Sequence, residues 1–210
     1  MINARKEILK QLSSKSRKTK RPSPWRSRHE SENLQKRFSL ALENVKGEIY
    51  LASDLEEVLS ILGDVLLELN AKKIVVSDEK PFRDIDFSAR FPEVEWHVVG
   101  KSNGNLRDFC NSADVGITSA DVALAETGSV VVSSGPGRSR AASLLSPVHI
   151  VILPNSKLLP DIFTWTANRG DDIPSQVVII SGPSKTADIE QTLVVGVHGP
   201  KRFIVILYSD

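Results

Sequence analysis

The sequence has a single cysteine, Cys110, and its four histidines (His29, His97, His149 and His198) are scattered along 210 residues. One thiol excludes an intramolecular disulfide framework and is typical of a reducing compartment. An iron–sulfur cluster usually needs about four cysteine thiolates, and a structural zinc site needs several Cys or His close together. We therefore expect no metal site and no cofactor in this chain.

Long apolar runs are also missing. The longest, such as HIVIL and VVII, have the length of a buried strand and fall far short of the ~20 residues of a membrane helix. The first residues lack the apolar core and the small-residue cleavage site of a secretory signal. The composition, 40% hydrophobic and 25% charged, is that of an ordinary globular protein. These features predict a protein without a membrane span.

Acidic residues are scarce at the N-terminus. Residues 1–37 hold twelve Lys or Arg against three Asp or Glu, a net charge of +9, and the remainder of the chain carries −8. Such a basic segment can bind nucleic acid or anionic lipid. Nothing later in the chain resembles a nucleic-acid module, so we favour a solvated tail, or a tail that folds onto the acidic body of a second copy in a homo-oligomer. We expect residues 1–30 to be a mobile or extended arm and residues 31–210 to form the domain.

From residue 34 onward, segments with helical spacing of apolar residues alternate with short apolar runs typical of buried strands. The expected helices are 34–45, 53–70, 105–112, 138–145, 158–170 and 186–194. The expected strands are 48–52, 72–78, 94–100, 147–154, 176–182 and 202–208, with a hairpin within 114–134. The clearest helix opens with a capping-box pattern, Ser53 followed by Glu56. This alternation predicts an α/β fold with a mostly parallel sheet flanked by helices.

Three glycine-containing polar segments fall at predicted strand ends, where ligands bind in α/β sheets. In the first segment, Gly128 lets a ligand approach the backbone closely, and Thr127 offers a hydroxyl. Glu126 is the candidate catalytic residue, because a carboxylate at such a site can act as a base or as a nucleophile. An ion pair with an arginine such as Arg138 explains Glu126 equally well.

The other two segments combine glycines with cationic side chains. Their candidate ligand-binding residues are Gly135, Gly137, Arg138 and Arg140 in the second segment, and Gly182, Ser184, Lys185 and Thr186 in the third. A glycine-rich turn that leads into a helix presents free backbone N–H groups to an anion. A flexible surface loop is the alternative, because neither segment fits a Walker A or Rossmann fingerprint. Since the ends of parallel strands gather at one edge, we expect the three segments to share one site for a small carboxylate or phosphate.

The segments ADVGITSADVALAETGSVVV, SPVHIVIL and GPSKTADIEQTLVVGVHGPKRFIVIL, within residues 34–208, resemble the LUD domain family of lactate utilization proteins. The resemblance implies a fold related to the NagB/RpiA/CoA transferase-like group. It also implies a cytoplasmic three-component system that oxidises L-lactate to pyruvate, in which partner subunits carry the iron–sulfur clusters. This chain lacks the cysteines of component B, so the resemblance places it as component C.

Two functions from different classes remain open at this point. In the first, the chain is a non-redox subunit of the lactate-oxidising system, where it positions a substrate or the iron–sulfur partners. In the second, it is a stand-alone CoA transferase-like enzyme that acts on an acyl or phosphorylated substrate through Glu126. Transferases of that fold group use a glutamate followed one residue later by glycine, as Glu126 is followed by Gly128 here. The missing dinucleotide and flavin fingerprints favour the first function, whereas the loop at residues 182–186 keeps the second open.

Overall fold

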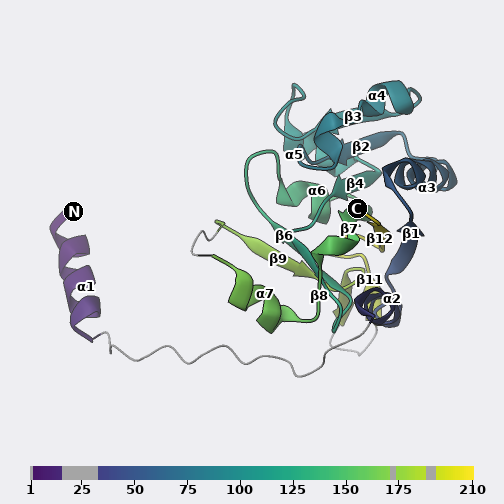
Figure 1. Cartoon of the computed structure of the whole chain (residues 1–210). Coiled ribbons are helices and arrows are strands. Elements are labelled where there is room, and N and C mark those ends of the chain that lie inside the picture. Colours follow the sequence, from purple (N-terminus) through teal and green to yellow (C-terminus); the bar gives the residue numbers. More distant parts are fainter. Residues whose placement is uncertain (1, 16–32, 171–173, 188–192) are drawn as a thin grey trace.

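The computed structural model of the chain describes residues 2–15, 33–170, 174–187 and 193–210. A six-stranded sheet, in which every neighbouring pair of strands is parallel, forms the centre of the body (Figure 1). In spatial order its strands are β1 (Glu48–Ala52), β12 (Arg202–Tyr208), β7 (Val148–Pro154), β4 (Val115–Thr118), β2 (Lys73–Val76) and β3 (Glu95–Val98). The predicted α/β fold with a mostly parallel sheet is confirmed.

Helices lie on both faces of this sheet. The helices of the body are α2 (Leu34–Asn44), α3 (Leu55–Glu68), α4 (Phe87–Arg90), α5 (Leu106–Ser112), α6 (Arg140–Leu144) and α7 (Ile162–Asn168), with short 3₁₀ turns at Phe82–Asp84 and Asn155–Lys157. In β12, Ile204 and Ile206 pack in the same cluster as Leu62 of α3, whereas Val205 packs in the cluster of Phe38 of α2. A strand covered on both faces must be apolar at every position, which explains the uninterrupted apolar runs of the sequence.

A second, smaller sheet packs over the α2 side of the first. Its strands, in spatial order, are β8 (Leu158–Leu159), β5 (Val122–Leu124), β6 (Ser129–Ser133) and β9 (Val177–Ile180). The pairs β5–β6 and β6–β9 are antiparallel. Ala123 and Val130 of this sheet share a buried cluster with Val151 and Val205 of the large sheet. The core therefore has two layers, one on each face of the six-stranded sheet.

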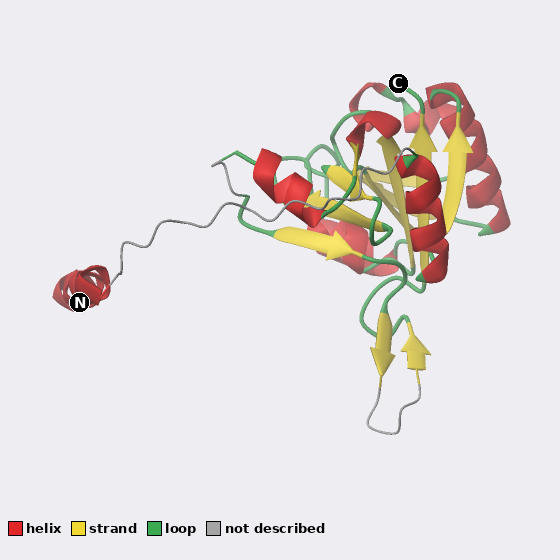
Figure 2. Ribbon diagram, turned by 60° about the horizontal axis from the view of Figure 1, so that its bottom comes forward, coloured by secondary structure: helices red, strands yellow, loops and turns green. Residues whose placement is uncertain are grey.

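A hairpin made of β10 (Lys185–Ala187) and β11 (Leu193–Val195) extends away from the rest of the body (Figure 2). The prediction of a helix over 186–194 is wrong where the structure describes it, because Thr186 pairs with Val194 in an antiparallel ladder. β-branched residues such as these two suit a strand better than a helix. Residues 188–192 lie outside the described part of the chain.

Two helices begin later in the sequence than predicted. The helix expected at 158–170 begins only at Ile162, because Leu158 and Leu159 pair with β5 and Asp161 caps α7. In α3 the capping residue is Asp54, one position after the expected Ser53, and it accepts from the Glu57 N–H at 2.9 Å. The capping box thus forms as predicted in kind but shifted by one residue.

Near the N-terminus, residues Ile2–Lys15 of the predicted mobile or extended arm form helix α1, and the mobility of this segment stays a prediction. Its larger apolar side chains, Ile8, Leu9 and Leu12, are each more than half exposed. The remainder of the predicted arm, residues 16–30, lies outside the described ranges. Across the described residues, no helix is both long enough and apolar enough to cross a membrane.

Candidate functional site

The strand order reverses between β2 and β4. From β2 the chain passes to β3 on one side, and then crosses back to β4 on the other side before continuing to β7. In open α/β sheets, ligands bind beyond the carboxyl ends of the strands at such a switch point. Glu79 follows β2 and Asp121 follows β4, so both carboxylates lie at this position.

Arg138 joins these two carboxylates. Its Nε lies 2.6 Å from Glu79 Oε2, and its Nη1 lies 2.6 Å from Asp121 Oδ1. The backbone next to it is fixed by Gly137, which has a φ of 72° and whose carbonyl accepts from the Asp78 N–H at 2.8 Å. A Cβ at Gly137 would stand 2.5 Å from the Asp78 carbonyl oxygen, so only glycine permits this approach.

Glu79 is the buried member of the cluster, with 7% of its surface exposed. Its Oε1 accepts from the Ser119 N–H at 3.2 Å. Burial raises the pKa of the Glu79 carboxyl, an effect that the adjacent Arg138 guanidinium opposes. A carboxylate buried without a cation would be strongly unfavourable, so Arg138 is required for charge balance as well as for geometry.

Lys157 approaches the same cluster from the 3₁₀ turn after β7. Its Nζ donates to the Ala120 carbonyl at 2.7 Å and lies 3.5 Å from Ser119 Oγ. Burial lowers the pKa of the Lys157 ammonium, and the charge of Glu79 opposes this shift. Together the two carboxylates and the two cations form a compact, charge-compensated group at the switch point.

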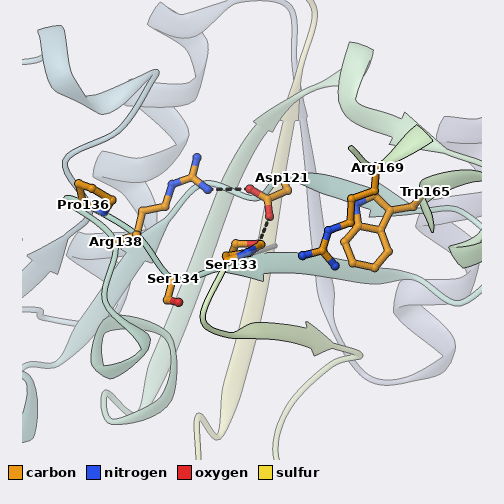
Figure 3. A pocket seen from close by; sticks show the side chains of 9 residues that line it. Asp121, Ser133, Ser134, Pro136, Arg138, Trp165 and Arg169 are labelled. Atoms are coloured by element: carbon orange, nitrogen blue, oxygen red, sulfur yellow. Dashed lines mark hydrogen bonds and ion pairs between the residues drawn. The ribbon is translucent and has the colours of Figure 1, made fainter. Parts of the chain in front are cut away.

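A pocket of about 540 Å³ opens next to Arg138, between the loop after β6 and helix α7 (Figure 3). It is lined by Asp121, Ser133, Ser134, Gly135, Pro136, Arg138, Trp165, Arg169 and Pro174. The Ser133 hydroxyl donates to Asp121 Oδ2 at the centre of this view. Asp121 therefore accepts from two neighbours, through one oxygen from Arg138 and through the other from Ser133.

Arg169 forms the opposite wall of the pocket. Its guanidinium carbon lies 5.1 Å from the centroid of the Trp165 ring, a cation–π contact, and Figure 3 shows it extending toward Ser133 and Asp121. Its Nη2 is buried, and no hydrogen-bond partner for it is found within the described ranges. Unlike Arg138, Arg169 has no ion pair with a described carboxylate. The pocket thus holds one guanidinium that is compensated and one that no carboxylate of the described residues compensates, an arrangement suited to binding an anion.

Comparison with known proteins identifies the family. A family model described as the LUD domain matches residues 35–208. The chain belongs to the LUD domain family. It is 38% identical over 156 residues to Lactate utilization protein C of Halalkalibacterium halodurans, which covers 71% of this chain and 68% of that protein. It is 34% identical over 165 residues to Lactate utilization protein C 1 of Bacillus mycoides, with coverages of 74% and 70%.

A solved structure supports the fold. The crystal structure of a DUF162 family protein from Deinococcus radiodurans superposes with a TM-score of 0.59, over 84% of this chain and 96% of that chain. At 18% sequence identity, this likeness concerns the architecture alone. The α/β arrangement of this LUD domain therefore occurs in an experimentally determined protein.

The predicted catalytic residue, Glu126, lies at the turn between β5 and β6 of the LUD domain, where its side chain is 39% exposed. Its Oε1 is 3.8 Å from Nη2 of Arg37 in α2, whereas Arg138 pairs with Glu79 and Asp121. Gly128 has a φ of 63°, and a Cβ there would lie 2.3 Å from the Leu42 nitrogen. The glycine of this segment is explained by close packing on α2. The roles predicted for Glu126 and Thr127 remain untested predictions.

The third predicted segment also lies against α2. A Cβ at Gly182 would stand 2.7 Å from the Val45 carbonyl oxygen, and Lys185 Nζ donates to that same oxygen at 2.6 Å. The Ser184 N–H donates to the carbonyl of Pro200, while Thr186 belongs to the β10–β11 hairpin. Lys185 therefore caps the end of α2, and no helix begins at residues 182–186 as the anion cradle required.

The structure does not bring the three predicted segments together. The first and third meet through Ser129 Oγ, which lies 2.7 Å from both Thr127 Oγ1 and Ser181 Oγ. The second begins at the far end of β6, about 15 Å away for a five-residue strand. Within the second segment, Gly135 and Arg138 line the pocket, whereas Arg140 is exposed at the start of α6 and lines a separate depression.

Several residues of the site were not among the predicted ones. They are Glu79, Asp121, Ser133, Lys157, Trp165 and Arg169. The strand-end rule that selected Gly135 applies equally to Glu79 and Asp121, since each lies within a few residues of the end of an apolar run. For Trp165 and Arg169, a four-residue spacing on a helix was the available signal. No group of His, Cys, Asp and Glu suited to a metal ion occurs in the part of the chain that the structure describes.

Proposed function

We propose that this chain acts in lactate utilization as a subunit without a redox centre of its own, together with iron–sulfur partner subunits in the cytoplasm. The observation that carries this proposal is the similarity to two proteins named Lactate utilization protein C, which extends over roughly 70% of each chain. The proposed role is that of component C of the lactate utilization system.

The state of the only cysteine supports a role without a cluster. Cys110 is fully buried in a small cluster with Val75 and Ala142, and burial raises the pKa of its thiol to about 11. Cluster ligation needs accessible thiolates. The electrons of lactate oxidation are therefore assigned to partner subunits, and this chain contributes binding and positioning.

The pocket beside Arg138 supports binding of a small carboxylate or phosphate ligand. It lies at the switch point of a parallel sheet, and it combines two guanidinium groups with the hydroxyls of Ser133 and Ser134. The alternative, a stand-alone CoA transferase-like enzyme acting through Glu126, receives less support. Glu126 sits on an exposed turn, pairs with Arg37 and does not line this pocket.

The decisive test is the turnover of the assembled system. We expect L-lactate-dependent reduction of an electron acceptor by the two iron–sulfur subunits to require this chain, and we expect the chain to co-purify with them. In a second step, the double variant Arg138→Gln with Glu79→Gln removes the guanidinium together with its buried carboxylate partner, and turnover should fall at least tenfold. Arg140→Gln, an exposed arginine two positions away, is the matched control. Undiminished turnover without the chain would refute the proposal.

A further inference from the structure

The size of the pocket beside Arg138 does not match lactate. Its volume is about 540 Å³, within the range of about 300–1,000 Å³ typical of sites for drug-sized ligands. A three-carbon acid would fill only a small part of that space and would leave the remainder to water. The walls on which a larger molecule would lie are already present, since Trp165 and two prolines, Pro136 and Pro174, line the pocket.

The distribution of charge identifies the residue that would hold an anion. Arg138 is already bound at 2.6 Å by both Glu79 and Asp121, so its charge is neutralised before any ligand arrives. Arg169 lines the same pocket, and its Nη2, which is covered from solvent, has no hydrogen-bond acceptor among the described residues. A buried donor without a partner is unfavourable, more so when it is charged. An oxyanion of a ligand would satisfy it.

The stacking of Arg169 on Trp165 makes this cationic wall of the pocket flat. A guanidinium 5.1 Å from an indole centroid forms, with the indole, a flat and cationic wall. Planar rings stack on aromatic side chains and on guanidinium planes alike, which is how proteins hold nucleobases. Ser134 lies in the opposite loop, where its hydroxyl accepts from the Gln176 N–H and contacts Ser175, and Figure 3 shows it on the side of the pocket away from Trp165.

We propose that this pocket binds an organic anion of mononucleotide size, whose planar ring lies against the Trp165–Arg169 pair and whose phosphate or carboxylate accepts from Arg169. The inference rests on the proposed function because it names the ligand class of the same pocket. It assigns Arg169 as the anion-binding residue. It assigns Arg138 as a positioning residue that orders the loop through Glu79 and Asp121.

Calorimetric titration of the purified full-length chain tests this directly. ADP is the probe, since it combines a planar ring with oxyanions, and L-lactate, inorganic pyrophosphate and adenosine separate size, charge and ring. We expect ADP to bind at least tenfold more tightly than each of the other three. Arg169→Gln should weaken ADP binding at least tenfold, and Trp165→Leu should weaken it as well. Arg140→Gln, which changes an exposed arginine outside the pocket, should bind ADP like the unaltered chain.

Three outcomes would overturn the inference: no ADP binding at millimolar concentration, L-lactate or pyrophosphate binding as tightly as ADP, or ADP affinity unaffected by Arg169→Gln. Thermal melts verify that each variant is folded, and Trp165→Phe, which keeps an aromatic ring, replaces Trp165→Leu if the latter unfolds; Trp165→Phe should then retain most of the affinity. The test is independent of turnover. If the assembled system requires the chain but ADP does not bind, only the ligand class is wrong, whereas ADP binding to a chain that is dispensable for lactate oxidation refutes the role in lactate utilization.

Discussion

Replacing Arg138 with methionine should destabilise the fold chiefly through the carboxylate that it leaves behind. The side chain of Glu79 is 8% exposed, and its Oε2 lies 2.6 Å from Arg138 Nε. Removing one partner of a buried ion pair costs about 3–5 kcal/mol, because the other charge stays buried without compensation. Since Arg138 is itself 31% exposed, water can replace part of its effect, and we expect a loss near the lower limit, about 3 kcal/mol.

The double variant distinguishes this cause from lost packing. In Arg138→Met combined with Glu79→Gln the buried carboxylate is removed as well, and Lys157 and Asp121 remain as opposite charges in the cluster, so most of the stability should return and the final loss should be about 1 kcal/mol. Lowering the pH should have a similar effect on the single variant. Burial raises the pKa of Glu79, and without Arg138 the pKa rises further, so the folded state gains a proton that the unfolded state does not hold. Stability of the single variant relative to the double variant should therefore increase as the pH falls from neutral toward the ordinary pKa of a glutamate carboxyl.

Urea denaturation, followed by tryptophan fluorescence and circular dichroism, measures these free energies for all four members of the cycle. The reasoning fails if Arg138→Met loses less than about 1 kcal/mol. It also fails if the double variant is as unstable as the single variant, because the loss would then come from packing of the arginine stem. A difference between the two variants that does not shrink at lower pH would exclude Glu79 as the titrating group.

Three further predictions concern residues outside the pocket. Burial lowers the pKa of His149 to about 3, so the free energy of unfolding should fall as the pH drops below about 6.5, by up to about 5 kcal/mol, and His149→Gln should flatten this dependence in urea titrations at several pH values. Gly116→Ala should cost at least about 2 kcal/mol, seen as a lower thermal midpoint, because its Cβ would stand 1.7 Å from the Ala142 carbonyl oxygen. Glu126→Gln should change stability by less than about 1 kcal/mol and leave turnover unchanged, because its ion pair with Arg37 is long and exposed; a large loss of turnover would restore Glu126 as the catalytic candidate.

The sequence was sufficient to predict the large sheet because its strands are covered on both faces. The runs KKIVVSD, PVHIVILP and RFIVILY coincide with β2, β7 and β12, and nearly all of their central residues are buried. Helix α3 was equally clear from its spacing of leucines and valines. Signals of this kind are local, so they predict the element without knowledge of the tertiary structure.

The predictions failed for short elements that form a strand only by pairing with another segment. Leu158 and Leu159 form a strand only because β5 lies beside them, and residues 185–187 do so only because β11 pairs with them. Neither segment carries a local strand pattern that outweighs the helical one. The pairing energy comes from contacts that a single sequence does not reveal, so tertiary context overrides local propensity.

The same argument explains why the sequence predicts a functional carboxylate at Glu126 whereas the structure has a buried, paired carboxylate at Glu79. A charge inside an apolar stretch of sequence suggests a functional residue, yet Glu126 lies at a hairpin turn where water solvates it. Glu79 follows a buried strand without any glycine motif. Its role becomes clear only in the folded protein, where the parallel sheet brings it next to Asp121 and Arg138. A charge that the fold must compensate is a stronger indicator of a site than a charge that stands out in the sequence, because compensation requires two or more chain segments to converge on one point.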